Sequence, residues 1–370
     1  MDARVVCARA VDSAIGGANR EPSGRWRGVP FEYPGGVSLR APSFLRRQMD
    51  DAWATVCTAL LLARLRKQGR LDCVYLYVAG QHWTPAAAVL DALLRALRVP
   101  VVIELNELPW SLWKVRSPLQ RLRHPLAGMT GVVAISGYLA SWARAEARRR
   151  RQPLEVLQVP ILVDVGEQHA LAHGDATPTM LFAGDVSAQN LDILRLIVSA
   201  IEEVWRTLPE CRLICVGADP GSGRLRAVLP RGPDGGVDAR VELPGFVPRA
   251  DLLALYARAS ALLLPLPADL TSVARFPTKL GEYLAARRPV ITTDVGEVGV
   301  YLTDAESAFV TPPGDTAAFA AAIRAVIENP ERAAQIAEAG FRVARKEFHY
   351  ARHSQALAEL LGRCAGRVTP

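Results

Sequence analysis

Short apolar runs alternate with longer amphipathic segments along most of this chain. The runs of strand length, in chain order, are residues 4–10, 73–79, 99–105, 131–136, 179–184, 212–217, 239–243, 260–265 and 290–293. They are rich in Val, Ile and Leu and do not alternate with polar residues, which indicates strands covered on both faces. Segments between them, such as residues 84–97, have the length of helices. The pattern predicts an α/β protein with parallel sheets in βαβ units.

A chain of 370 residues is too long for one ordinary hydrophobic core, so we expect two domains. Residues 160–178 lack clear periodicity and carry Gly, His, Asp and Pro, which is typical of a linker. We predict two Rossmann-like domains facing across a cleft, at 1–165 and 166–350. Residues 351–370 are predicted to form a C-terminal helix that packs back on the first domain. Ligands of such sheets bind at the carboxyl ends of the strands.

Composition narrows the class of protein further. Half of the residues are apolar and 22% are charged, as in globular proteins. No apolar run approaches the ~18 residues of a membrane span, and Asp2 and Arg4 interrupt any signal peptide. We therefore expect a cytoplasmic protein. The six cysteines form no C-x-x-C pair and the six histidines show no ligand spacing, so we predict no metal site.

The net positive charge is confined to the first half of the chain. Residues 1–165 carry 23 Lys and Arg against 13 Asp and Glu, a net charge of +10, and the remainder carries −3. Basic and aromatic residues mix in 110–123, and Arg148 to Arg151 form a second basic group that also favours a helix end. We expect this half to contact an anionic membrane surface or a lipid-diphosphate-linked acceptor. No nucleic-acid-binding module accompanies the charge, so we expect no nucleic acid.

The segment FPTKLGEYLAARRPVITTDVGE, residues 276–297, contains the most informative pair of charges. Pro277 and Thr278 predict the start of a helix that ends near Pro289. Lys279 lies in the first turn, where the helix dipole is already positive, so a bound anion would favour a lysine there. Glu282 shares its helix face. A cation for phosphate beside a carboxylate for ribose hydroxyls suits a nucleotide diphosphate. The alternative is an ordinary amphipathic helix with solvated charges.

Five segments resemble the family 4 glycosyltransferases, which have the two-Rossmann-domain GT-B fold. They are TMLFAGD, RLICVGADP, VELPGFVPRADLLALYARASALLLPLP, the segment just quoted, and AFVTPPGDTAAFAAAIRAVIENPERAAQIAEAG. Their order and spacing also match, and P-T-K-L-G-E-Y-L-A resembles the donor-site helix of one subfamily. The resemblance covers essentially the whole chain. It implies transfer of a sugar from a nucleotide diphosphate to a hydroxyl of a glycan, lipid-linked or small-molecule acceptor. Retention of configuration and no metal or other cofactor are implied with it.

The resemblance also assigns roles to single residues. Lys279 would hold the donor diphosphate, Glu282 would accept from the ribose, and Glu107 would face the acceptor and the reacting carbon. The further donor-binding residues implied are Gly184, Gly245, Phe246, Val247, Arg275, Thr278, Leu280, Gly296 and Glu297. The acceptor side would comprise His82, Glu107, Trp110 and Ser136. Structural alternatives remain open for several of these: a plain turn at 245–247, a surface carboxylate at Glu297, helix caps at Glu107 and Ser136, and a structural role for His82.

The chain departs from the family in ways that leave other functions open. Ala274 stands where most members carry a first glutamate, and Asp185 and Asn190 stand where two diphosphate cations are usual; Arg275 can replace one. Residues 4–10 resemble the family's second strand, so we predict that the usual first strand is absent, unless residues 15–17 supply its glycine loop. Glu104, on a strand body, is expected to pair with a core arginine. The alternatives are a non-catalytic or degenerate GT-B partner subunit and a GT-B sugar-nucleotide epimerase.

Overall fold

The computed structural model describes residues 2–11, 19–77, 85–109, 124–166, 177–184, 191–217 and 219–366. Contacts divide the chain into two compact units. The first unit comprises Met1–Ala134, Leu139–Gln158 and Ser354–Pro370, and the second comprises Ile135–Tyr138 and Val159–His353. Each unit has its own sheet. The division within the C-terminal helix assigns the last residues of the chain to the first unit.

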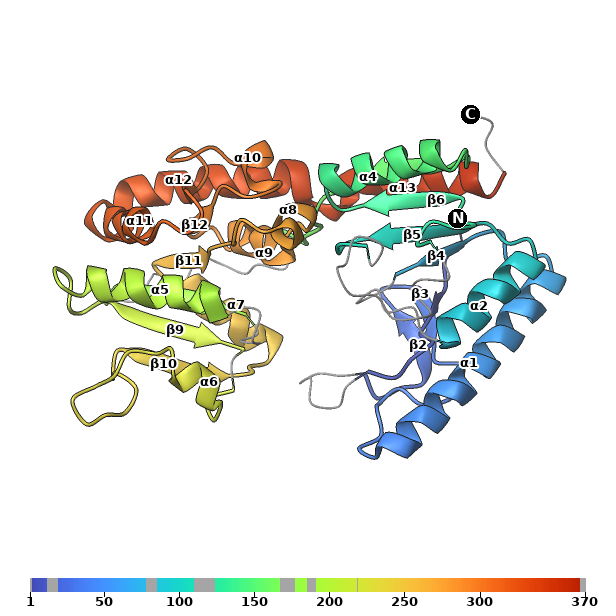
Figure 1. The fold of residues 1–370 in the computed structure, drawn as a ribbon, viewed down its shortest axis with the longest axis horizontal. Coiled ribbons are helices and arrows are strands. Elements are labelled where there is room, and N and C mark those ends of the chain that lie inside the picture. The colour runs from blue at the N-terminus through green and yellow to red at the C-terminus, as the bar shows by residue number, and fades with distance from the viewer. Residues whose placement is uncertain are drawn as a thin grey trace. The chain divides into compact units, whose positions relative to one another are not determined.

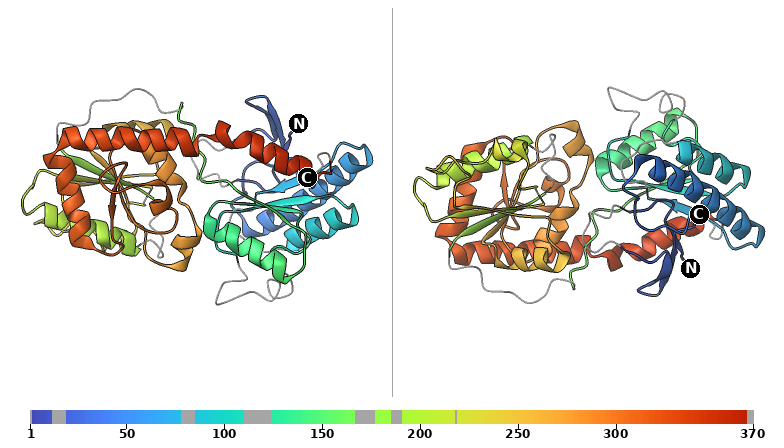
Figure 2. Two further views of the ribbon diagram at one scale, coloured as in Figure 1. Left: turned by 90° about the horizontal axis from the view of Figure 1, so that it is seen from above. Right: turned by 90° about the horizontal axis from the view of Figure 1, so that it is seen from below.

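The main sheet of the first unit has four parallel strands in chain order, as the continuous apolar runs predict. They are β4 (Val74–Leu76), β5 (Val101–Leu105), β6 (Gly131–Ala134) and β7 (Glu155–Gln158). Helices α4 (Gly137–Arg149) and α13 (Tyr350–Cys364) lie on opposite sides of this sheet (Figure 2). All four residues of β6 are buried, so both faces of the sheet are covered.

The end of α13 is fitted closely to this sheet. A Cβ atom on Gly131 would lie 2.9 Å from the Cys364 sulfur, so glycine lets the helix approach the start of β6. Arg363 also donates to Glu155 at 3.3 Å. The last turns of α13 therefore pack on the first unit by a close backbone approach and a surface ion pair.

The expectation of a buried parallel strand over residues 4–10 is wrong. Only β1 (Val5–Val6) is extended, and it pairs with β3 (Val29–Glu32) in a separate three-stranded sheet with β2 (Ser23–Trp26). Strands β2 and β3 form a hairpin whose two turn residues, Arg27 and Gly28, both have positive φ, as type I′ turns require. Val5 is half exposed. This small sheet covers too little apolar surface to bury a central strand.

Two helices lie side by side in the first unit (Figure 1): α1 (Phe44–Lys67) and α2 (Pro85–Ala96). Their C-terminal ends are joined by Arg66, whose guanidinium donates to the Leu97 carbonyl at 3.2 Å. Near the middle of α1, a Cβ atom on Gly35 would lie 2.9 Å from that of Ala54, so the loop after β3 packs directly on α1. The face of α1 with Thr55, Thr58, Leu62 and Leu65 is buried.

The sheet of the second unit has six parallel strands in the order β10-β9-β8-β11-β12-β13. They are β8 (Thr179–Ala183), β9 (Arg212–Val216), β10 (Val241–Gly245), β11 (Ala261–Leu264), β12 (Val290–Thr293) and β13 (Phe309–Thr311). Counted within the unit, this is the 3-2-1-4-5-6 order of a Rossmann fold. The order reverses between β8 and β11, and ligands of such folds bind at the carboxyl ends beside this reversal.

Helices surround the second sheet. They are α5 (Leu191–Val204), α6 (Gly223–Arg226), α7 (Arg249–Arg258), α8 (Leu270–Ala274), α9 (Thr278–Ala285), α10 (Val298–Tyr301), α11 (Thr316–Glu328) and α12 (Pro330–Val343), followed by the π-helix η3 (Ala344–Phe348). Alternate strand residues such as Met180 and Leu213 share one buried cluster with α5 and α11. Helices α7 and α9 contact β8 and β11, and their Tyr256 and Tyr283 lie outside that cluster. The sheet thus lies between two layers of helices, with α5 and α11 on one face and α7 and α9 on the other.

The start of the predicted linker is an integrated part of the second unit. The Val163 N–H donates to the Phe348 carbonyl at 2.8 Å, and Ile161 is buried. A Cβ atom on Gly281 in α9 would lie 3.3 Å from the Ile161 side chain. Residues 161–163 therefore pack along α9.

Candidate functional site

Three glycines end three neighbouring strands at the carboxyl edge of the second sheet. Gly184 follows β8 and donates to the Val216 carbonyl at 3.0 Å; Gly217 follows β9 and donates to the Gly245 carbonyl at 2.8 Å. Gly217 and Gly245 have positive φ, and a Cβ atom on Gly217 would lie 3.0 Å from the Gly184 carbonyl oxygen. Side chains are thereby excluded from this edge. A ligand can approach the backbone closely there.

The loop after β10 and the turn before α9 carry several of the predicted donor-binding residues. Phe246 directly follows Gly245 and is 77% exposed, whereas Val247 is half-buried. Arg275 ends α8 and is exposed, as is Thr278 at the start of α9. Leu280, in contrast, is fully buried. Its side chain packs in the core beneath the first turn of α9, so only its backbone can face a ligand.

Lys279 lies in the first turn of α9, after β11 and beside the strand-order reversal. Its side chain is half-buried, and no described residue forms a hydrogen bond or an ion pair with it. The helix has no side-chain cap and no acidic residue in its first turn. The local backbone dipole is positive there. Lysine and helix end therefore present uncompensated positive charge, which suits an anion.

Glu282 already has a partner in the protein, so it is less available to a ligand than the sequence suggests. Its Oε1 accepts a hydrogen bond from Arg249 at 3.0 Å, and Arg249 is the first residue of α7. The side chains of Arg249 and Glu282 remain 48% and 25% exposed. Arg249 was not among the predicted site residues, because the two residues are 33 positions apart and nothing in the local pattern joins them. The structure thus places a further cation against Glu282, which lies three residues after Lys279 in α9.

Two buried tyrosines lie on the side of α9 that faces the sheet. The Tyr283 hydroxyl accepts from the Ala183 N–H at 2.9 Å, which ties α9 to the end of β8 just before Gly184. Tyr256 of α7 packs edge-on against Tyr283, with ring centroids 5.1 Å apart. Burial raises the pKa of both hydroxyls, so both stay neutral. The ring of Tyr256 thereby fixes the spacing of α7 and α9.

Ser136, Gly296 and Glu297 meet at one place in the second unit. Ser136 is fully buried and its Oγ donates to the Ala274 carbonyl at 2.6 Å. Glu297 is buried too, and its Oε1 accepts from the Gly137 N–H at 2.8 Å. Glu297 is therefore not a surface carboxylate: it bonds the first backbone N–H of α4, where negative charge is favourable. These contacts hold the chain immediately before Arg275.

Gly296 is the closest point of contact between the loop after β12 and helix α8. It has a φ of +60°, and a Cβ atom there would lie 3.0 Å from the Ser272 carbonyl oxygen and 3.1 Å from that of Val273. Both the left-handed backbone and the lack of space favour glycine. The position of α8, and with it Arg275, depends on this contact.

Of the residues predicted to bind the acceptor, Glu107 follows β5 in the first unit and is half-buried. Its neighbour Asn106 has a buried Oδ1 that accepts no hydrogen bond from any residue that the structure describes, a feature that no sequence pattern signals. Among the described residues no arginine pairs with Glu104; it accepts a hydrogen bond from the hydroxyl of Tyr75, a residue of the neighbouring strand β4. Burial raises the pKa of Glu104. His82 and Trp110 lie outside the described residues.

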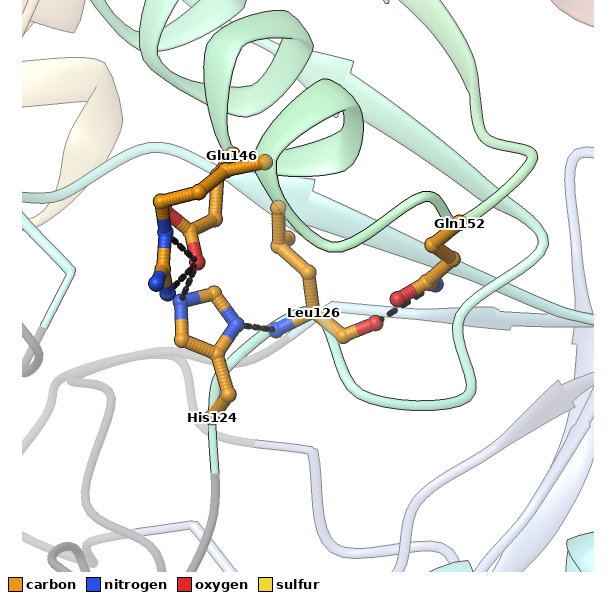
Figure 3. Close-up of polar contacts among 5 residues, drawn as sticks. His124, Leu126, Glu146 and Gln152 are labelled. Atoms are coloured by element: carbon orange, nitrogen blue, oxygen red, sulfur yellow. Dashed lines mark hydrogen bonds and ion pairs between the residues drawn. The ribbon is translucent and has the colours of Figure 1, made fainter.

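A separate polar network lies near the C-terminal end of α4 (Figure 3), whereas Glu297 contacts the N-terminal end of that helix. His124 Nε2 lies 3.0 Å from Glu146 Oε1, and its Nδ1 accepts from the Leu126 N–H at 3.2 Å. Because Nδ1 is an acceptor, the ring is neutral with its proton on Nε2. Burial lowers the pKa of His124, and Arg149, which binds Glu146, lowers that of the carboxylate. Gln152 donates to the Leu126 and Met129 carbonyls, so the network fixes the loop that leads into β6.

No group of three or more His, Cys, Asp or Glu within the described ranges has the arrangement of a metal site. No helix among the described residues combines the length and apolar character that a bilayer crossing requires.

Sequence comparison relates the chain to enzymes that transfer sugars. Residues 177–329 match the family described as Glycosyl transferases group 1. The chain is also 24% identical over 313 residues to α-D-kanosaminyltransferase of Streptomyces kanamyceticus, which covers 78% of this chain and 76% of that protein. The matched residues 177–329 contain β8 to α11 and therefore Lys279, Glu282 and Arg249.

Solved structures share the fold over nearly the whole chain. Sucrose-phosphate synthase from Thermosynechococcus elongatus superposes with a TM-score of 0.66 at 17% identity, covering 97% of this chain and 88% of that chain. Anabaena HepE in complex with UDP-glucose gives a TM-score of 0.62 at 18% identity, covering 91% and 86%. These likenesses show the GT-B fold of two Rossmann-like units.

Proposed function

We propose that this protein is a glycosyltransferase that moves a sugar from a nucleotide diphosphate to a hydroxyl group of an acceptor. The observation that carries the proposal is the position of Lys279. It is a partly buried cation without a partner among the described residues, in the first turn of a helix beside the strand-order reversal of a Rossmann sheet. The group 1 glycosyltransferase match over the same residues supports this function.

The reaction requires stabilisation of a leaving group. The bond between the sugar's anomeric carbon and the diphosphate oxygen breaks, and a bond from the acceptor hydroxyl oxygen to that carbon forms. The hydroxyl proton passes to the proposed catalytic carboxylate, Glu107, and the diphosphate leaves with an additional negative charge. Lys279 and the amino end of α9 would stabilise that charge as it develops, with Arg275 and Arg249 as further cations. In the family 4-like version that we propose, configuration is retained and no metal is needed.

The proposed donor pocket comprises the glycines at the carboxyl edge of the second sheet and the amino ends of α7 and α9. Gly184 and Gly245 would let phosphate and base approach the backbone, while exposed Phe246 and half-buried Val247 would border the base. Glu282 would accept from the ribose hydroxyls after exchanging its bond with Arg249. Because HepE was solved with UDP-glucose, UDP is the first nucleotide to test. An amino sugar is a second donor class to test, given the name of the kanosaminyltransferase relative.

The acceptor would be a glycan, a lipid-linked sugar or a small molecule, handled by the first unit. Glu107 is the proposed catalytic carboxylate there, at the carboxyl end of β5. His82 and Trp110 remain proposed acceptor residues, and Ser136 would act through its bond to the backbone before Arg275. We further propose a cytoplasmic enzyme whose basic first unit touches the inner face of a membrane.

Nucleotide binding by Lys279 variants tests the proposal most directly. We expect UDP, GDP or dTDP to raise the unfolding temperature of the wild-type protein. Lys279→Ala should abolish this shift, because a charge-assisted contact contributes about 1.5–3 kcal/mol, and Glu282→Ala should reduce it. Lys346→Ala is a matched control, since Lys346 is an exposed cation in the same unit. Equal shifts in the wild-type protein and both site variants would refute the assignment.

The pairing of Glu282 with Arg249 gives weight to one alternative, a partner subunit without catalysis. If this pair never opens, the ribose carboxylate is unavailable. Slow release of nucleoside diphosphate from one nucleotide sugar would favour the transferase. Binding of none of the three nucleoside diphosphates would favour the partner subunit. Interconversion of one nucleotide sugar into its epimer, without an acceptor, would favour the epimerase.

A further inference from the structure

Helix α1 exposes an unusual number of large apolar side chains. Six of them lie along it with half to three-quarters of their surface exposed: Phe44 65%, Leu45 73%, Met49 67%, Trp53 59%, Val56 50% and Leu60 66%. We refer to the five from Leu45 to Leu60 as the apolar stripe. Side chains of this size and exposure amount to on the order of 600 Å² of apolar surface, at the upper end of the roughly 300–600 Å² of the largest patch on a typical monomer.

The stripe follows one face of the helix. From Leu45 to Leu60 its members recur at intervals of four, four, three and four residues, which keeps them on one side. At 1.5 Å per residue the stripe is about 22 Å long. The opposite face, with Thr55, Thr58, Leu62 and Leu65, is buried in the unit. Helix α1 lies at the outside of its unit, with α2 on one side (Figure 1). The stripe is therefore not part of the unit's core.

Positive charge flanks the C-terminal end of the stripe. Arg64 and Lys67 continue its line beyond Leu60 and are exposed, and no described residue forms an ion pair with either. At the other end Arg46 is exposed and forms an ion pair with Asp50 at 3.0 Å, and Asp51 is partly buried. The exposed face thus combines apolar and cationic groups.

This charge pattern distinguishes between two possible occupants. If two copies paired through the stripe in parallel orientation, Arg64 and Lys67 of the two helices would meet as like charges at the rim of the contact. In antiparallel orientation they would face the ion pair of Arg46 with Asp50, which offers them no net opposite charge. An anionic surface neutralises Arg64 and Lys67 directly, and the net charge of +10 over residues 1–165 adds to that attraction.

We propose that α1 is an interfacial helix that lies along a bilayer containing anionic phospholipids. The apolar stripe enters the boundary between headgroups and acyl chains, and Arg46, Arg64 and Lys67 contact lipid phosphates. This deepens the proposed membrane contact of the transferase by naming the element that makes it. It does not depend on the donor chemistry, which resides in the second unit.

Flotation of the full-length protein with lipid vesicles tests the proposal. We expect the wild-type protein to float with vesicles of phosphatidylglycerol and phosphatidylcholine, and salt should weaken the binding. The double variant Leu45→Gln, Leu60→Gln should bind about tenfold or more weakly, since it removes two apolar anchors. Arg64→Ala with Lys67→Ala should weaken binding to anionic vesicles. Val300→Gln is the matched control, because Val300 is 69% exposed in the second unit.

Two further measurements keep the outcome decisive. Because the substituted side chains are exposed, each variant should keep the wild-type unfolding temperature and the wild-type response to UDP. A wild-type protein that binds UDP but ignores anionic vesicles would overturn the role of α1 while leaving the transferase proposal intact. A wild-type dimer in light scattering that the Leu45→Gln, Leu60→Gln variant converts to a monomer would also overturn it, in favour of a second copy of this chain. If the protein binds vesicles through the stripe but does not respond to UDP, the result would support the membrane role of α1 and count against the transferase proposal.

Discussion

Lys279 and Glu282 lie in the same helix but differ in how their charges are compensated. Lys279 has no partner among the described residues, whereas Glu282 is held by Arg249 at 3.0 Å. An exposed ion pair contributes only ~0–1 kcal/mol, so a bound nucleotide can replace it at little cost. The same guanidinium is our candidate for a further contact to the diphosphate.

We therefore expect Arg249→Ala to weaken binding of UDP by about tenfold, which corresponds to the loss of one charge-assisted hydrogen bond. Binding of uridine, which carries no phosphate, should change little or improve, because Glu282 is released. Isothermal titration with both ligands measures the difference. Arg249→Lys, which keeps the charge, should restore part of the UDP affinity. Tighter binding of UDP by Arg249→Ala would show that Arg249 only blocks Glu282.

Among elements, α8 depends on a loop that follows a different strand. Gly296→Ala would place a methyl group 3.0 Å from the Ser272 carbonyl oxygen at a φ of +60°. We expect α8 and Arg275 to shift, so that UDP binding weakens and stability falls by more than the ~1–2 kcal/mol of a left-handed alanine. Gly314→Ala is the matched control, since Gly314 has a φ of +79° and open space around it. Equal losses in both variants would exclude a role for the α8 contact.

The elements also show what local patterns predict. Strand β12 has its predicted bounds and helix α9 its predicted start after Pro277, whereas α9 ends at Ala285, a few residues before the predicted stop at Pro289. The hairpin β2–β3 and the stripe on α1 were missed, since an apolar residue in an amphipathic run is normally assigned to the core. Pairs such as Arg249–Glu282 and Ser136–Ala274 join positions 33 and 138 residues apart, so only the fold brings them together.

At the scale of the whole molecule, the pH dependence of stability combines groups with opposite titration behaviour. Burial raises the pKa of Glu104 above the 4.5 of an unperturbed carboxyl, so its contribution to stability is complete below pH 4.5 and is lost as pH rises through the folded-state pKa. Burial lowers the pKa of His124 below 6.5, so its contribution is present above pH 6.5 and is lost as pH falls through the folded-state pKa. Both groups belong to the first unit.

Two variants separate these contributions in thermal unfolding. Glu104→Gln keeps an acceptor for the Tyr75 hydroxyl and removes the buried charge. It should therefore unfold at a higher temperature than the wild-type protein at pH 8, and it should lose that advantage near pH 4.5.

His124→Asn keeps an acceptor for the Leu126 N–H but loses the contact with Glu146, so it should cost more stability at pH 7.5 than at pH 5. A loss that is larger at pH 5 would mean that the imidazole is charged in the folded protein. That result would contradict the hydrogen-bond pattern of Figure 3, in which Nδ1 accepts.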